Sequence, residues 1–231
     1  MGKMQTEFDT HLPVVTALSH LDDTATTDLL AQSHSQIGPR MRRRIAKRRI
    51  VQDRRLSLAG YTTLIQLVAR HLGRPIESIS IEADATGRPF VCEEPDLRVT
   101  LSHSGTWLLA AVSDVPVGVD IEEIVAANEW RIEPALTSSE RRWVRHSRGS
   151  DRPVRSTSLW VVKESYLKAL GVGLRSDPKH IHVDVPRSGH AHVRDDGRPH
   201  SPFLPSARVA QFDGYVLAAC ILLPNDGGVP I

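Results

Sequence analysis

Two short motifs constrain the fold of this chain more than any other feature: residues 118–122 and residues 160–168. The first motif, Gly-Val-Asp-Ile-Glu, lies in an apolar run and is typical of a β-strand, in which residues two apart point to the same face. Asp120 and Glu122 can therefore reach one cation together, while Ile121 points away from them into packing.

The second motif, Trp-Val-Val-Lys-Glu-Ser-Tyr-Leu-Lys, is typical of a helix and carries Lys163, Glu164 and Lys168. With Asp120 and Glu122 it offers three carboxylates and a lysine, which suit a hard divalent ion that holds a phosphate-bearing substrate. The alternative is a solvated helix surface, because Glu164 and Lys168 form an i,i+4 pair that contributes only about 0.2–0.5 kcal/mol. Only five of the 29 basic residues are lysines, and two lie in this motif, which favours a functional role.

A cluster of basic residues is the main departure from an ordinary globular composition. The net charge of +2 is too small to indicate a nucleic-acid-binding protein, but one segment is crowded with Arg40, Arg42, Arg43, Arg44, Lys47, Arg48, Arg49, Arg54 and Arg55. Such a segment attracts phosphates or acidic partners. Composition alone leaves three alternatives open: a solvated helix face, a nucleic-acid patch and a phosphate clamp.

The two cysteines and the first ten residues indicate the cellular compartment of the protein. Cys92 and Cys220 lack metal-ligand spacing, and we expect both to be reduced residues of the core. Residues 1–10 contain no apolar stretch of the kind found in signal peptides. No run approaches the roughly 18 apolar residues of a membrane span. The sequence thus predicts a cytoplasmic protein with no membrane partner.

The elements expected along the chain form two similar halves, each a helix packed on a few strands, with a boundary near residues 115–118. We expect strands at 12–18, 79–81, 99–101, 107–113, 116–121, 182–185, 207–212 and 215–222, the last two joined as a hairpin across Asp213–Gly214. We expect helices at 22–32, over most of 37–72, from the capping box at 137–140, and at 159–170. Residues 148–155 are predicted to be a polar loop, and residues 187–205 a loop or weak hairpin.

Four motifs in order carry a resemblance to a known family: residues 87–89 (Gly-Arg-Pro), 101–105 (Leu-Ser-His-Ser-Gly), 118–122 and 160–168. Together they resemble the Sfp-type 4′-phosphopantetheinyl transferases, over about residues 39–222. Members of this family move the phosphopantetheine arm of coenzyme A onto a serine of an apo acyl or peptidyl carrier protein. They use Mg²⁺ and release adenosine 3′,5′-bisphosphate.

The resemblance implies an α+β fold, a pseudo-twofold pair of similar α/β halves with a coenzyme A cleft at the seam. It places the basic coenzyme A-binding segment 40–57 in an N-terminal half, 1–115, and the metal and catalytic motifs in a C-terminal half, 116–231. It also implies a monomer whose partners are carrier proteins and coenzyme A, and neither nucleic acid nor membrane.

The resemblance also assigns roles at the metal and the transferring group. Asp120, Glu122 and Glu164 match the Mg²⁺ ligands, with Mn²⁺ as the other candidate ion, and Glu164 is similar to the proposed general base for the incoming serine. Lys168 matches the lysine that steadies the pyrophosphate. Glu140 matches another acid sometimes assigned near the metal, although its capping-box position offers a structural alternative.

The remaining matched positions concern coenzyme A. Ser102 and His103 match phosphate contacts, and Arg88 stands where the family has a basic residue near the adenine. Ser57 matches a small hydroxyl residue at the 3′-phosphate, and Arg44 and Arg49 lie where basic residues reach that phosphate. Two positions depart from the family, because Met41 and Leu56 stand where relatives often have basic residues.

Two functional alternatives follow from the residues themselves. A nucleic-acid-binding protein could use the segment 40–55, but that leaves both signature motifs unexplained. An inactive carrier-protein-binding module could share the fold, but the intact acidic and lysine positions argue against it.

Other polar residues are also candidate site residues. Ser102 and His103 could form a nucleophile and base, but no Gly-x-Ser-x-Gly elbow frames them. The histidines His180, His182, His190 and His192 are predicted to be surface residues.

Overall fold

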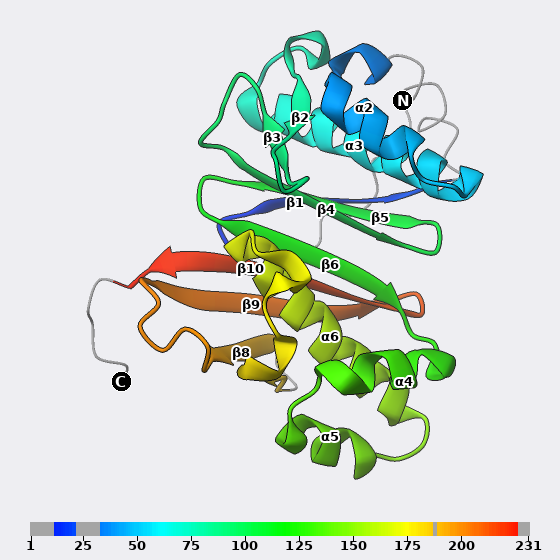
Figure 1. Cartoon of the computed structure of the whole chain (residues 1–231), viewed down its shortest axis with the longest axis vertical. Helices are drawn as coiled ribbons and strands as arrows, with labels where there is room; N and C mark the ends of the chain where they lie inside the picture. The colour runs from blue at the N-terminus through cyan, green and yellow to red at the C-terminus, as the bar shows by residue number, and fades with distance from the viewer. Residues whose placement is uncertain (1–11, 22–32, 187–188, 226–231) are drawn as a thin grey trace. The chain divides into compact units, whose positions relative to one another are not determined.

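The computed structural model describes residues 12–21, 33–186 and 189–225 (Figure 1). The chain divides into two compact units, Met1–Asp114 and Val115–Ile231. Each combines helices with antiparallel sheet, so the predicted α+β class is confirmed. Among the helices that the structure describes, none is long and apolar enough to cross a membrane.

The first unit is built around one long helix on a sheet. Its described elements are β1 (Val15–His20), η1 (Ser33–Gln36), α2 (Pro39–Ala46), α3 (Val51–Leu72), η2 (Ile76–Ser78), β2 (Ile81–Ala83), β3 (Pro89–Val91), β4 (Arg98–Ser104) and β5 (Trp107–Ser113). The sheet has the antiparallel order β1-β5-β4, and α3 packs against all three strands (Figure 1). Leu64, Ile65, Leu67 and Val68 of α3 are fully buried, and they form the centre of this core.

The second unit also packs a long helix on an antiparallel sheet, and its sheet is larger. Its described elements are β6 (Val117–Glu123), η3 (Ala126–Asn128), α4 (Glu129–Ile132), η4 (Glu133–Ala135), α5 (Ser138–Arg145), α6 (Asp151–Leu170), η5 (Gly173–Arg175), η6 (Pro178–His180), β7 (Ile181–Asp184), β8 (His190–Asp195), β9 (Phe203–Phe212) and β10 (Tyr215–Pro224). The antiparallel order is β6-β10-β9-β8-β7. Helix α6 packs mainly on β6 and β10.

Local signals explain where several elements end. Asp213 and Gly214 have φ of 43° and 79°, which is the pair of positive values that a tight two-residue hairpin between β9 and β10 requires. Gly171 ends α6 in the left-handed conformation with φ of 72°. The predicted hairpin and the predicted end of the helix are both confirmed.

Two expectations about local structure need correction: the loop at 148–155 and the burial of Cys92. Residues 151–155 are the first turns of α6, not a loop, because Pro153 stands in the first turn, where no intrahelical N–H is needed. Residues 190–195 form β8, which pairs antiparallel with β9 at His190 and Ala191, so the weak hairpin is the correct alternative for this segment. Cys92 is exposed, whereas Cys220 is buried as expected. The segment 37–72 is mostly helical, as expected, and consists of the two helices α2 and α3. The helix expected at 22–32 lies outside the described residues.

Candidate functional site

The close packing of α6 on β6 brings the two signature motifs together. A Cβ added at Gly118 would lie 2.5 Å from the Ala169 nitrogen and 2.8 Å from the Lys168 Cβ, and closer still to the Ser165 carbonyl oxygen. Only glycine leaves room for the helix backbone at this point of the strand. Since residues two apart share a face, Asp120 and Glu122 also lie on the side of β6 that α6 covers.

Asp120 and Lys168 form the central ion pair of this packing. The Lys168 Nζ donates to the Asp120 Oδ1 at 2.7 Å and to the Val119 carbonyl oxygen at 3.0 Å. Asp120 is buried, and the Lys168 side chain is only 26% exposed. Lys168 therefore reaches across to another element, and the alternative of a solvated pair on one helix face is wrong.

Glu164 is a second carboxylate near this ion pair, one turn before Lys168 on α6. Burial raises its pKa above the usual value, the negative charge of Asp120 raises it further, and the positive charge of Lys168 opposes both. The placement agrees with these effects, because Glu164 and Lys168 are one turn apart on α6 and Lys168 bonds to Asp120. A carboxylate with a raised pKa is a better proton acceptor than an ordinary surface glutamate.

Glu122 borders a hollow of about 300 Å³ that Arg131, Thr157 and Trp160 also line. Within the described part of the chain, no three acidic, histidine or cysteine side chains are arranged to hold a metal ion. The predicted set of Asp120, Glu122 and Glu164 is thus not assembled as a metal site, and it stays a prediction. Its chemistry nevertheless fits Mg²⁺, which prefers carboxylate oxygens, and a divalent cation would relieve the repulsion between Asp120 and Glu164.

Glu140 and Lys163 belong to the framework of the second unit. Lys163 is completely buried, and its Nζ donates to the Glu140 Oε2 at 2.7 Å and to the carbonyl oxygens of Ala135 and Pro178. The Glu140 carboxylate also accepts from the Thr137 and Val183 backbone N–H groups. The capping box is therefore confirmed, and both Glu140 oxygens are engaged in structural bonds.

The basic segment of the first unit borders a second hollow, of about 310 Å³. Its walls are Arg40, Arg43, Arg44 and Lys47 of the α2 segment and, on the other side, Ala83 at the end of β2 and Asp84, Ala85 and Gly87 of the following turn. Of the residues predicted to reach the 3′-phosphate, only Arg44 lines it. Ser57 is buried, and its hydroxyl donates to the Asp53 carbonyl oxygen, while Arg49 lies in the exposed link between α2 and α3.

The departures at Met41 and Leu56 have a structural reason. Both side chains are buried, at 0% and 5% exposure, and they belong to the core rather than to the basic surface. The charged positions of the α2 segment therefore alternate with core positions, as an amphipathic helix requires.

The other predicted coenzyme A residues lie on and beside the strands of the first unit. Arg88 precedes β3, and within the described residues its buried Nη2 has no hydrogen-bond partner. Burial and the nearby Arg98 lower the pKa of Arg88, against the opposing charge of Asp84. The neighbouring guanidinium groups of Arg88 and Arg98, together with the buried Arg88 Nη2 donor, suit the binding of an anion. Ser102 and His103 lie half-buried in β4, opposite Leu109 and Leu108 of β5.

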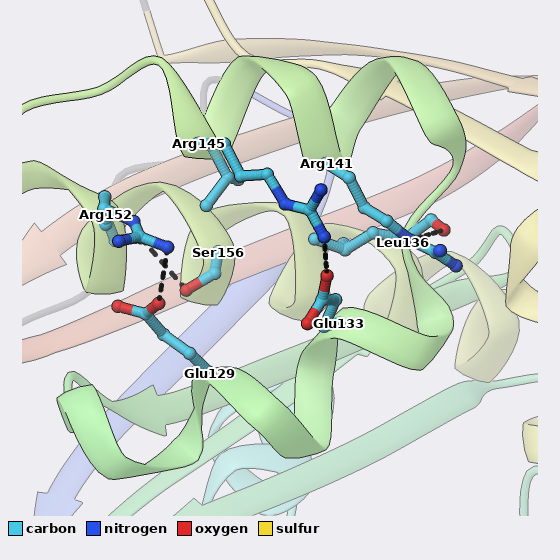
Figure 2. Close-up of a pocket in the computed structure, with 8 residues that line it drawn as sticks. Glu129, Glu133, Leu136, Arg141, Arg145, Arg152 and Ser156 are labelled. Atoms are coloured by element: carbon cyan, nitrogen blue, oxygen red, sulfur yellow. Dashed lines mark hydrogen bonds and ion pairs between the residues drawn. The ribbon is translucent and has the colours of Figure 1, made fainter.

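A third hollow, of about 220 Å³, lies in the second unit between α4, α5 and the start of α6 (Figure 2). It contains none of the predicted site residues. Arg145 pairs with Glu133, Arg152 pairs with Glu129, and Arg141 donates to the Leu136 carbonyl oxygen. No local sequence pattern predicts this hollow, because its residues, from 129 to 156, meet only through the packing of helices.

Comparisons with known proteins show which sequences this chain resembles. Residues 116–220 match the model of the 4′-phosphopantetheinyl transferase superfamily, and residues 24–114 match that of the 4′-phosphopantetheinyl transferase N-terminal region. The chain is 27% identical over 177 residues to the 4′-phosphopantetheinyl transferase psf-1 of Bacillus pumilus, covering 77% of this chain and 76% of that one. It is 28% identical over 176 residues to the 4′-phosphopantetheinyl transferase gsp of Aneurinibacillus migulanus, covering 76% and 72%.

Among solved structures, the chain is similar to a holo-(acyl-carrier-protein) synthase of Bacillus anthracis, whose structure was determined in complex with coenzyme A. The sequence identity is 22% and the TM-score is 0.41, and the match covers 47% of this chain and 95% of that chain.

Proposed function

Because this chain belongs to the 4′-phosphopantetheinyl transferase superfamily, we propose that it transfers the phosphopantetheine arm of coenzyme A to a serine of an apo carrier protein. The acceptor is an acyl or peptidyl carrier protein, and the other product is adenosine 3′,5′-bisphosphate. The observation that carries the proposal is the cluster of Asp120, Glu164 and Lys168 between β6 and α6.

The residue chemistry suits this reaction. The serine oxygen forms a bond to the phosphorus that bears the pantetheine arm, and the bond from that phosphorus to the bridging pyrophosphate oxygen breaks. A serine hydroxyl is a weak nucleophile, so Glu164, whose pKa is raised by burial and by Asp120, accepts the proton. Lys168 offers its ammonium group to the pyrophosphate oxygens, where charge develops as the nucleotide leaves.

Asp120, Glu122 and Glu164 are the residues that would hold Mg²⁺. The ion supplies charge neutralisation of the pyrophosphate when bound. In the structure, Lys168 is the counter-ion of Asp120. The ammonium group that balances the buried carboxylate is thus the same group that we propose to contact the substrate.

The first unit supplies the residues for coenzyme A in this proposal. Arg44 in the hollow beside the turn at 83–87 is the candidate for the 3′-phosphate, with Arg49 and Ser57 as further sequence-based candidates. Arg88 is the candidate near the adenine, and Ser102 and His103 are candidates for the other phosphates. The protein is further proposed to be a cytoplasmic monomer, and light scattering of the purified protein tests the oligomeric state.

Intact-protein mass spectrometry tests the function directly. Apo acyl and peptidyl carrier proteins are incubated with the protein, coenzyme A and Mg²⁺, with chelator and without. The expected result is a gain of one phosphopantetheine mass that chelator abolishes. Binding of coenzyme A without transfer to any carrier would favour the inactive module instead. Binding of generic DNA that weakens steeply with salt, with no affinity for coenzyme A, would favour the nucleic-acid alternative.

A further inference from the structure

The start of helix α2 is capped by a residue from another element. Gly38 stands at the N-cap and has no side chain to offer, and Pro39 has no backbone N–H. The Glu82 carboxylate of β2 takes the place of the cap: it accepts from the Arg40 N–H at 3.1 Å and from the Met41 N–H at 2.9 Å.

The glycine and the glutamate fit each other. A Cβ added at Gly38 would lie 2.5 Å from the Glu82 Cδ, so any other residue would displace the carboxylate. Glu82 accepts a third bond from the Ala83 N–H at 2.8 Å. Burial alone would raise the pKa of Glu82, but the N–H groups of Ala83, Arg40 and Met41 outweigh it and hold the pKa below its usual value. Both oxygens of the charged carboxylate therefore accept from backbone N–H groups.

This cap fixes the position of a basic helix face. Arg40, Arg43, Arg44 and Lys47 follow an i, i+3, i+4, i+7 spacing, which places them on one side of α2. That side forms one wall of the 310 Å³ hollow. The opposite wall is the turn that follows β2 directly, and a Cβ at Gly87 in that turn would clash with the Arg44 guanidinium. Glu82 joins the two walls, because its strand leads into one and its carboxylate holds the other.

We infer that Glu82 is a positioning residue for the binding of the coenzyme A 3′-phosphate. The inference rests on the proposed function, because it takes the hollow to be the site of that phosphate. Glu82 does not itself contact the phosphate, since two anions repel. It acts by holding α2, and with it Arg44, at a fixed distance from the turn at 83–87.

Calorimetric titration with coenzyme A and with 3′-dephospho-coenzyme A tests this inference without a carrier protein. In Glu82→Ala we expect the dissociation constant for coenzyme A to rise by about tenfold, and that for the dephospho compound to stay within twofold. Glu93→Ala is the matched control, because Glu93 accepts from the Ser80 N–H at 2.9 Å on the same hairpin but does not cap α2. That variant should bind both compounds as the wild type does.

A double-mutant cycle separates positioning from a general loss of structure. Arg44→Ala should also weaken coenzyme A selectively, and adding Glu82→Ala to it should weaken binding little further, because Glu82 acts through Arg44. Where Glu82→Ala does not fold, Glu82→Gln replaces it, since the amide keeps the volume and one acceptor oxygen. Equal weakening of both compounds, full additivity with Arg44→Ala, or no weakening in Glu82→Gln each overturns the inference.

The outcomes also distinguish the inference from the proposed function. Wild-type protein that transfers phosphopantetheine but binds coenzyme A and its dephospho form equally well would overturn the inference alone. Selective binding of coenzyme A that Glu82→Ala abolishes, without transfer to any carrier, would support the inference and count against the transferase proposal.

Discussion

Replacing Gly118 by alanine should separate the two signature motifs. The new Cβ would start 2.5 Å from the Ala169 nitrogen, whereas ordinary contacts begin at 3.4 Å, so α6 must move at least 0.9 Å away from β6. The Lys168 Nζ and the Asp120 Oδ1 are 2.7 Å apart, and a movement of this size along the bond would stretch it to about 3.6 Å, beyond a hydrogen bond. The carbonyl oxygen of Ser165 lies closer to the new Cβ, so the true displacement is larger.

Two magnitudes follow from this displacement. Overpacking of this kind costs about 1–3 kcal/mol of unfolding free energy, and loss of the Lys168 bond adds to it because Asp120 stays buried. A misplacement of about 1 Å at a reacting centre costs on the order of a hundredfold in rate. Gly118→Ala should therefore lower the transfer rate about a hundredfold even under conditions in which the variant remains folded.

The assay combines urea unfolding with the carrier-protein mass assay under conditions in which the variant is fully folded. Gly149→Ala is the control, because a Cβ at Gly149 would meet nothing within 4 Å. That variant should keep its stability within about 0.5 kcal/mol and its activity. Wild-type stability and rate in Gly118→Ala would refute the reasoning, since they would mean that α6 does not need this close approach.

Three further predictions concern charged groups. Lys163→Met should cost about 3–5 kcal/mol in urea unfolding, because it leaves the buried Glu140 carboxylate without its ammonium; a loss below about 1 kcal/mol would contradict this. Glu164→Gln should abolish transfer in the mass assay yet unfold at the same or higher urea concentration, since burial and Asp120 both disfavour the charge; full turnover would remove Glu164 from the role of base. Because the pKa of Glu82 is lowered from 4.5 by folding, its stabilisation is present above pH 4.5 and is lost as the pH falls through the lower folded value. The difference in unfolding free energy between wild type and Glu82→Gln should therefore shrink from pH 7 to pH 3, and a constant difference would show that charge is not the reason.

Local sequence patterns were sufficient to predict features that depend on a single strand, turn or helix start. The alternation at 118–122 predicted the strand β6 and the shared face of Asp120 and Glu122, and the Asp213–Gly214 pair predicted the hairpin. The capping box at Thr137 predicted the start of α5. Each of these features depends on residues that are close along the chain.

Features that depend on tertiary packing could not be predicted. Lys163 lies next to Glu164 in the sequence, yet it points to Glu140 of α5, which only the packing of the two helices reveals. The cap that Glu82 provides joins a strand to a helix 42 residues earlier, where no local pattern signals it. The start of α6 was missed because its first turns are polar and contain Pro153.

The three bonds to the Glu140 carboxylate also concern the motions of the second unit. Its oxygens accept from Lys163 of α6, from the Thr137 amide that precedes α5, and from the Val183 amide of β7. Since Glu140 lies in α5, neither α6 nor β7 can detach from α5 without breaking a bond to this carboxylate. The amide hydrogens of Thr137 and Val183 should then exchange with deuterated solvent in the same opening event, at one common rate. The region around α6 would open as a single cooperative block, and the segment that carries Glu164 would not fluctuate separately from the sheet beneath it.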